Sequence, residues 1–308
     1  MVKANKTELV ANDFVIRAKG VSKTFGVHTA LRDVNLDIQK NSVTAILGTN
    51  GAGKTTFIHC CLGLTKPSRG NLSIFGKKPG SMESRRRVGV MLQDADLPDL
   101  LTPREHIALF ASYYPSPLPL ANVLDICNLE GFATKKYKAL SGGQKRRVQF
   151  ALAIIGNPDL IFLDEPTTGL DTEARRMVWE VIRRLANEGR TIVLTTHYLE
   201  EADALSDRIV VLDAGNVIAN APTAEIQALA GGAMIKCVTD IPPKDIGKMP
   251  KVVSVRHNGR FTEINTQDSP STLRALLSED ANLSELIVKK PSLEEAFDQL
   301  THSQKKKS

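Results

Sequence analysis

The sequence predicts an α/β fold with a mostly parallel sheet covered by helices, an inserted helical subdomain and a small C-terminal α+β appendage. Three observations lead to this class. Short apolar runs alternate with helical patterns over residues 43–205. Residues 94–137 contain helical pieces separated by breaks, without a strand pattern. After Gly231 and Gly232 the pattern changes to short strands, a hairpin signal and short helices.

The composition is that of an ordinary soluble globular protein, with 42% hydrophobic and 24% charged residues. The net charge of +6 is mild for 308 residues, so we expect no nucleic-acid partner. The four cysteines lack metal-ligand spacing, which favours reduced thiols in a cytosolic protein. No apolar run reaches the roughly 20 residues that span a bilayer, and the N-terminus lacks a signal-peptide core. We therefore expect the chain to stay inside the cell, with another subunit supplying any membrane span.

The expected elements follow one another around a glycine-rich loop. The apolar run at residues 43–47 predicts a strand before this loop, and a helix follows it. A second short strand, within RRRVGVML, leads to Gln93. The helical subdomain then covers about residues 94–157. Its last helix, in LSGGQKRRVQFALAII, begins with an S-x-x-Q capping box.

Buried strands and helices continue after the helical subdomain. LIFLDEP is a continuous apolar run, typical of a strand that is buried on both faces of a parallel sheet. A helix is predicted over residues 172–187, a strand in TIVLTT and a helix in YLEEADAL. Asn258 and Gly259 predict a β-hairpin in the appendage. The expected parts are a flexible N-terminus (1–12), a core domain (13–230), an α+β accessory domain (231–301) and a basic tail (302–308).

GTNGAGKT, residues 48–55, matches the phosphate-binding loop G-x-x-x-x-G-K-[ST] in the strand–helix context that this motif requires. Its backbone N–H groups would surround the phosphates of ATP, and the helix dipole adds partial positive charge there. Lys54 would reach the β- and γ-phosphates, and Thr55 would hold Mg²⁺. The other loop residues that we expect to bind the nucleotide are Asn50, Gly51, Gly53 and Thr56. The core is therefore predicted to be a P-loop NTPase.

Polar residues at the ends of other strands are the catalytic candidates. Asp164 and Glu165 end LIFLDEP, and such a buried pair is costly unless a cation or a mechanism uses it. Asp164 suits a role at Mg²⁺, and Glu165 suits the group that orients or activates the attacking water. Gln93 could contact Mg²⁺ or that water. His197, after TIVLTT, is placed to bond the γ-phosphate.

The helix start at Ser141 is a second anion-binding element in a chain that already has a phosphate loop. Ser141 offers a hydroxyl, Gly142 and Gly143 leave N–H groups uncovered, and Gln144 completes the capping box. Since no catalytic lysine or acid lies in this loop, it looks like half of a site. Taken alone, it also fits an ordinary capped helix. The basic residues 145–147 would then face water, or favour phosphates at long range.

The order of GTNGAGKTT, Gln93, LSGGQ, LIFLDEP, GLD and TTH resembles that of the ATP-binding cassette (ABC) family of transporter ATPases, over about residues 13–225. The resemblance implies that two protomers enclose two ATP molecules head to tail. Ser141 and Gly143 of one protomer would then bind the γ-phosphate that Lys54 of the second protomer holds. Gly142 and Gln144 belong to the same nucleotide-binding loop as Ser141 and Gly143.

Two further residues take roles from the same resemblance. Asp171, in GLD, would line the contact between protomers. Phe25, in VSKTFG, lies where the family places an aromatic ring that stacks on adenine; tyrosine is common there, and phenylalanine keeps the ring face. Thr172 replaces a usual proline after GLD and can still cap the following helix.

GLDTEARRMVW, TTHYLEEAD and the closing PSLEEAF resemble the exporter branch that includes drug-resistance, polyketide and polysaccharide efflux ATPases. The resemblance implies an ATPase subunit that powers an exporter through ATP-driven dimerisation, as a homodimer or with another nucleotide-binding domain. It would act peripherally at the cytoplasmic face of the cell (inner) membrane, with a separately encoded integral membrane permease. We expect Leu97, Leu100 and Leu101 either to border a groove for a permease helix or to be buried in the insert.

Two other classes of function remain open from the sequence. One is a soluble cassette protein that acts on ribosomes, DNA or cluster assembly, although neither a second cassette nor a long coiled-coil insertion is present. The other is a nucleotide-gated binding module that hydrolyses little ATP. The presence of Glu165 and His197 argues against that module.

Overall fold

The computed structural model describes residues 13–93, 95–229, 232–289, 293–294 and 296–297, apart from the side chains of residues 228 and 229. The chain divides into two compact units, residues 1–220 and 221–308. The expected flexible N-terminus, the basic tail and most of residues 291–300, where the last of the expected short helices begins, lie outside the described residues. The proposed domain boundary at residue 230 also falls outside them and stays a proposal.

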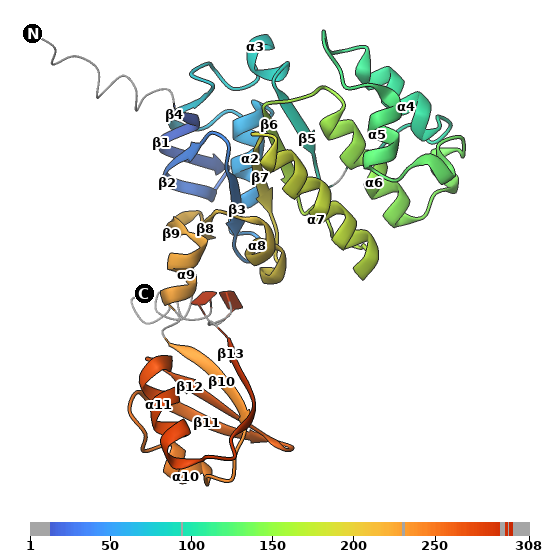
Figure 1. Cartoon of the computed structure of the whole chain (residues 1–308). Coiled ribbons are helices and arrows are strands. Elements are labelled where there is room, and N and C mark those ends of the chain that lie inside the picture. Colours follow the sequence, from blue (N-terminus) through green and yellow to red (C-terminus); the bar gives the residue numbers. More distant parts are fainter. Residues whose placement is uncertain (1–12, 94, 230–231, 290–292, 295, 298–308) are drawn as a thin grey trace, which may run out of the picture. The chain divides into compact units, whose positions relative to one another are not determined.

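A six-stranded sheet forms the centre of the first unit (Figure 1). Its order is β5 (Val88–Met91), β6 (Leu160–Asp164), β7 (Thr191–Thr195), β3 (Val43–Leu47), β8 (Arg208–Asp213) and β9 (Asn216–Pro222). The neighbours from β5 to β8 pair in parallel. Every residue of β3, β6 and β7 is buried, as their continuous apolar runs predict. The expected α/β core with a mostly parallel sheet is confirmed.

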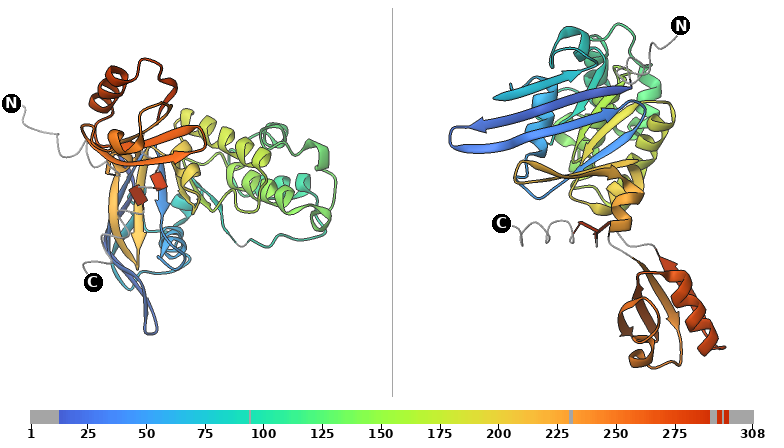
Figure 2. Two further views of the ribbon diagram at one scale, coloured as in Figure 1. Left: turned by 90° about the horizontal axis from the view of Figure 1, so that it is seen from below. Right: turned by 90° about the vertical axis from the view of Figure 1, so that its left-hand side faces the viewer.

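A second, antiparallel sheet lies in the same unit. Its order is β2 (His28–Gln39), β1 (Phe14–Phe25) and β4 (Arg69–Ile74). Figure 2 shows β1 and β2 side by side as a long ribbon. Helix α2 (Lys54–Leu62) joins the two sheets, because one hydrophobic cluster contains Ile16 of β1, Phe57 of α2 and Phe162 of β6. None of the three strands of this antiparallel sheet was predicted from the sequence.

Helices gather beside the β5 edge of the six-stranded sheet (Figure 1). After α3 (Met82–Arg85) and β5 come α4 (Pro103–Ala111), α5 (Leu120–Ile126), short 3₁₀ turns and α6 (Gly142–Ile154). Among the described residues of 94–137 there is no strand, as expected. Helix α6 approaches β5 closely, since a Cβ on Gly89 would lie 1.9 Å from the Ala153 carbonyl oxygen. Only glycine allows this approach of helix and strand.

Two more predicted helices follow β6 and β7. Helix α7 (Thr172–Asn187) has the predicted bounds and buries its apolar stripe, Val178, Val181, Ile182 and Leu185. Helix α8 (Leu199–Leu205) corresponds to the predicted helix in YLEEADAL. No helix in the described ranges has both the length and the apolar character needed to cross a membrane.

The second unit begins with the end of β9 and α9 (Thr223–Leu229), then forms its own sheet. Its elements follow in the order β10 (Ala233–Val238), α10 (Pro243–Ile246), β11 (Val252–Asn258), β12 (Phe261–Thr266), α11 (Ser269–Glu279) and β13 (Ser284–Lys289). The strand order β11-β12-β10-β13, all antiparallel, is that of a split β-α-β ferredoxin-like fold. The predicted hairpin is confirmed, with Asn258 paired to Phe261.

Candidate nucleotide-binding site

The phosphate-binding loop connects β3 to α2. Gly53 ends this loop with a φ of 106°, and a Cβ there would lie 2.5 Å from the Ala30 carbonyl oxygen. Glycine is therefore required by both the conformation and the space. Lys54 is the first residue of α2, and its Nζ donates to the carbonyl oxygens of Gly48 (2.7 Å) and Thr49 (3.2 Å). The loop's own carbonyls thus hold the ammonium group over the loop.

The charge of Lys54 lies opposite two carboxylates. The side chain is buried, and desolvation lowers the pKa of Lys54 below its ordinary value. The nearby charges of Glu165 and Asp164 act in the opposite direction and favour the charged ammonium. The buried ammonium is thus balanced by two carboxylates and held by the carbonyl oxygens of the phosphate loop.

A cavity of about 360 Å³ collects most of the predicted nucleotide residues. The predicted residues that line it are Phe25, Asn50, Gly51, Gly53, Lys54, Thr55, Thr56, Gln93 and Glu165. Phe25 is 49% exposed, so one face of its ring is available for stacking. The cavity therefore combines an aromatic side chain, a phosphate loop and a carboxylate.

Asp164 ends β6 and is only 1% exposed. Its Oδ1 accepts a hydrogen bond from the Thr195 hydroxyl. Its Oδ2 is buried and has no hydrogen-bond partner among the described residues. A buried carboxylate oxygen of this kind is costly without a cation.

The oxygen groups near Asp164 fit Mg²⁺. Thr55 and Gln93 line the adjoining cavity, and hydroxyl, amide and carboxylate oxygens are the ligands that Mg²⁺ prefers. No cluster of three or more His, Cys, Asp or Glu side chains in the described residues could hold a metal by itself. Mg²⁺ usually takes one or two protein ligands together with phosphates and water, so it does not need such a cluster.

Glu165 adopts a left-handed backbone conformation, with a φ of 51°. This conformation costs a residue other than glycine about 1–2 kcal/mol. Its N–H donates to Thr195, to both the carbonyl and the hydroxyl oxygen at 3.1 Å. Its carboxylate accepts from the Thr168 hydroxyl (3.1 Å) and lies 3.4 Å from Nδ1 of His197. The predicted catalytic residues Glu165 and His197 are therefore in direct reach of each other.

The signature stretch LSGGQ lies apart from the phosphate-loop cavity. The predicted capping box is confirmed: Ser141 Oγ accepts from the Gln144 N–H (3.2 Å), and Gln144 Oε1 accepts from the Ser141 N–H (3.0 Å). The Ser141 hydroxyl proton remains free to donate. None of residues 141–144 lines the phosphate-loop cavity, although Gly142 lines a neighbouring one with Gln93.

Asp171, which is predicted to line the contact between protomers, caps a helix of its own chain. It is the N-cap of α7, and its Oδ1 accepts from the Ala174 N–H at 2.8 Å. The predicted residues thus fall into two groups. One group lines the phosphate-loop cavity or, like Asp164 and His197, lies beside it; the other lies at the starts of α6 and α7, at Ser141 and Asp171.

Arg146 lies where the sequence did not predict it. The basic run was expected to face water or to act on phosphates at long range, but Arg146 is 9% exposed and donates to main-chain carbonyls at the ends of β5 and β6. Helical spacing was the available signal, because Phe150 and Ala153 follow on the same buried face at i+4 and i+7.

A phosphate loop after one buried parallel strand and a carboxylate pair at the end of another define a P-loop nucleotide-binding protein. Comparison with known proteins places the chain within this class. The ABC transporter family model matches residues 31–168. "Nod factor export ATP-binding protein I" of Rhizobium johnstonii is 36% identical, over 92% of this chain and 93% of the relative.

Two further matches extend the comparison. "Daunorubicin resistance ATP-binding protein DrrA3" of Streptomyces coeruleorubidus is 33% identical, over 94% of this chain and 96% of the relative. A solved dimer of the ATP-binding cassette MJ0796, bound to ADP and phosphate, is 30% identical with a TM-score of 0.63, over 67% of this chain and 98% of the cassette. The chain belongs to the ABC transporter family, and it is an ATP-binding ATPase subunit.

Proposed function

We propose that the chain energises a membrane exporter by closing with a second nucleotide-binding domain on ATP. The two relatives described above are named for Nod factor export and daunorubicin resistance, and both align along more than nine tenths of the chain. This length of similarity supports a transport subunit and disfavours the soluble alternative. The proposed location is the cytoplasmic face of the inner membrane, where the chain would bind peripherally.

The observation that carries this proposal is the separation of the two anion-binding elements. Lys54 lies in the phosphate-loop cavity, whereas Ser141 and Gly143 do not line it. A second protomer, of the same or another chain, would bring the helix that begins at its LSGGQ stretch (the signature helix, α6 in this chain) to this cavity. The dimeric form of the similar cassette supports such pairing. ATP then favours the closed pair, and hydrolysis with phosphate release removes that preference.

Mg²⁺ is the proposed second cofactor. Thr55, Gln93 and Asp164 would hold it, and the ion would neutralise phosphate charge during hydrolysis. Lys54 would bind the phosphates, and Glu165 would orient the attacking water as a general base. His197 lies beside Glu165 and would bond the γ-phosphate.

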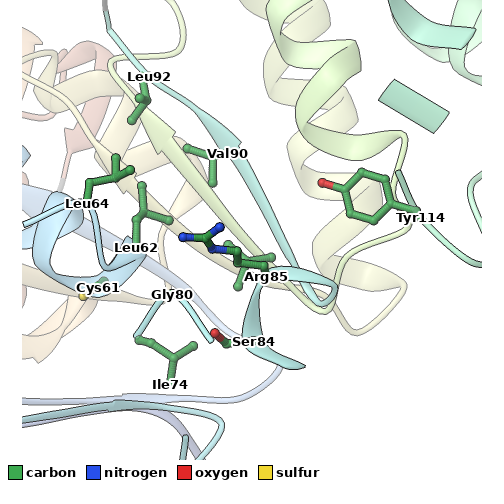
Figure 3. Close-up of a pocket in the computed structure, with 11 residues that line it drawn as sticks. Cys61, Leu62, Leu64, Ile74, Gly80, Ser84, Arg85, Val90, Leu92 and Tyr114 are labelled. Atoms are coloured by element: carbon green, nitrogen blue, oxygen red, sulfur yellow. The ribbon is translucent and has the colours of Figure 1, made fainter. Parts of the chain in front are cut away.

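An apolar pocket of about 420 Å³ is the proposed contact with a separately encoded membrane permease. In Figure 3, Leu62, Leu64, Val90 and Leu92 gather on one side and Tyr114 lies on the other. The pocket adjoins the nucleotide site along the chain, because Leu92 directly precedes Gln93. A cytoplasmic helix of the permease would insert apolar side chains here.

The predicted groove residues 97, 100 and 101 remain candidates for the same contact. Leu100 is 65% exposed, and Leu97 lines the cavity that contains Gln93. Leu97 and Leu101 are half-buried, and together with the exposed Leu100 they fit the border of a docking surface better than a core. The permease helix would therefore lie near Gln93 whichever of these residues it contacts.

Substitution of an exposed pocket residue tests the permease contact. Leu64 is 59% exposed, so Leu64→Glu should leave folding and basal ATPase activity intact. Purified from membranes in mild detergent, the variant should lose the co-purified permease that the unsubstituted chain retains. Val253→Glu, at an equally exposed site in the second unit, is the matched control. A permease that stays bound to Leu64→Glu would contradict this docking site.

A further inference from the structure

The guanidinium of Arg146 lies at the carboxyl edge of the six-stranded sheet. Its Nη1 donates to the carbonyl oxygens of Leu92 (3.1 Å) and Gln93 (3.0 Å). Its Nη2 donates to the carbonyl oxygens of Asp164 (3.0 Å) and Glu165 (2.6 Å). These carbonyls lie at or just beyond the ends of the neighbouring strands β5 and β6. One side chain of α6 therefore joins both strand ends.

Arginine is suited to this position by its shape. The guanidinium is planar, always charged and has donors that point in fixed directions, so it can bond to two strands at once. Nη1 also donates to Gln149 Oε1 at 2.9 Å, and Gln149 Nε2 donates to the Ala95 carbonyl oxygen at 2.9 Å. The group is thus held in place from α6 and from the segment after Gln93.

The hydrogen bond from Arg146 to the carbonyl oxygen of Glu165 helps to hold an unfavourable backbone conformation. The φ of 51° at Glu165 is unfavourable, and such a conformation persists only when its surroundings hold it. Thr195 of β7 accepts from the N–H of Glu165, and Arg146 of α6 donates to its carbonyl. The residue is therefore held from both sides of its main chain, with its carboxylate at the phosphate-loop cavity.

We propose that Arg146 is a positioning residue for ATP hydrolysis. It keeps Glu165 in the strained conformation that directs the carboxylate to the nucleotide, and it makes that conformation depend on the position of α6. Since α6 begins directly after Ser141, contact of Ser141 with the ATP of a second protomer is transmitted through one helix to the main chain of Glu165. The inference rests on the proposed role of Glu165 in activating water.

The first test separates positioning from charge. In the full-length chain, Arg146→Gln should lower kcat about 10- to 100-fold, because small displacements of a catalytic group have effects of this size. KM for ATP should stay within about twofold, since the phosphate loop is untouched. Arg146→Lys, which keeps the charge but cannot bridge both strands, should recover kcat only in part. Arg184→Gln removes the same charge from an exposed position of α7 and should have little effect on kcat.

The second test shows whether Arg146 acts through Glu165. In a Glu165→Gln background, adding Arg146→Gln should change the residual rate by less than about twofold, because residues that act as one unit are non-additive. Unfolding midpoints of all variants identify any loss of folding. A wild-type kcat in Arg146→Gln, an equal loss in Arg184→Gln, or full additivity with Glu165→Gln would each overturn the inference. Failure of the proposed role of Glu165 is distinct, since Glu165→Gln alone would then keep its activity.

Discussion

At the residue scale, Glu165 combines an unfavourable backbone conformation with a closely surrounded carboxylate. The carboxylate contacts the Thr168 hydroxyl and the His197 ring, and it lies near the buried ammonium of Lys54. Each neighbour comes from a different segment of the first unit. The geometry thus fixes where the carboxylate lies relative to the phosphate loop, which is what a group that orients water requires.

Glu165→Gln should separate nucleotide binding from turnover. The amide keeps the size of the side chain but cannot accept a proton, so ATP binding should persist while phosphate release falls by about 100-fold or more. The ATP-bound pair of domains should then accumulate and be visible as a dimer by sedimentation. A monomer in saturating ATP would count against the sandwich, and rapid turnover would count against the role of Glu165.

At the scale of elements, the close packing of α6 against β5 sets the position of the signature helix. Gly89 permits this packing, because its missing side chain makes room for the Ala153 carbonyl. The same helix carries Ser141 at its start and Arg146 farther along. A shift of α6 away from β5 would therefore move two candidate functional residues together.

Gly89→Ala should destabilise the chain and slow hydrolysis at the same time. The added methyl group cannot fit 1.9 Å from a carbonyl oxygen, so α6 must move, at a typical overpacking cost of about 1–3 kcal/mol. Thermal unfolding and steady-state phosphate release measure the two effects. Gly131→Ala is the control, since a Cβ there meets nothing within 4 Å. Unchanged stability in Gly89→Ala would show that α6 can move freely.

The elements that could be predicted are those with a strong local signal. Strands β3, β6 and β7 are continuous apolar runs, and α7 has a regular buried stripe. The antiparallel sheet was missed because register shifts interrupt β1, so its buried residues do not alternate. The phosphate loop and capping box are local motifs that could be read directly. The four carbonyl partners of Arg146 could not, because they are main-chain atoms of distant segments.

At the scale of the whole molecule, two units each have a separate core. One cluster joins both sheets of the first unit, and a smaller one, which includes Ile235, Ile264 and Leu276, fills the second. The phosphate-loop cavity and the signature helix lie entirely in the first unit. The second unit is therefore expected to be dispensable for binding the nucleotide.

A chain that ends after residue 229 should fold and bind MgATP. This variant keeps all of β9 and α9 and removes the ferredoxin-like sheet with its separate core. Calorimetric titration with ATP should give a dissociation constant within about threefold of the full chain, and unfolding should remain cooperative. Loss of binding with folding intact would show that the second unit contributes to the nucleotide site.

The contacts of Arg146 also predict how the contacted positions can vary among related chains. Every residue type presents a carbonyl oxygen, so substitutions at positions 92, 93 and 164 can change the side chain without removing the acceptor. The bonds to these main-chain oxygens therefore constrain only the arginine. Among related chains, position 146 should show no correlated change with positions 92, 93, 164 and 165, even where the link is preserved.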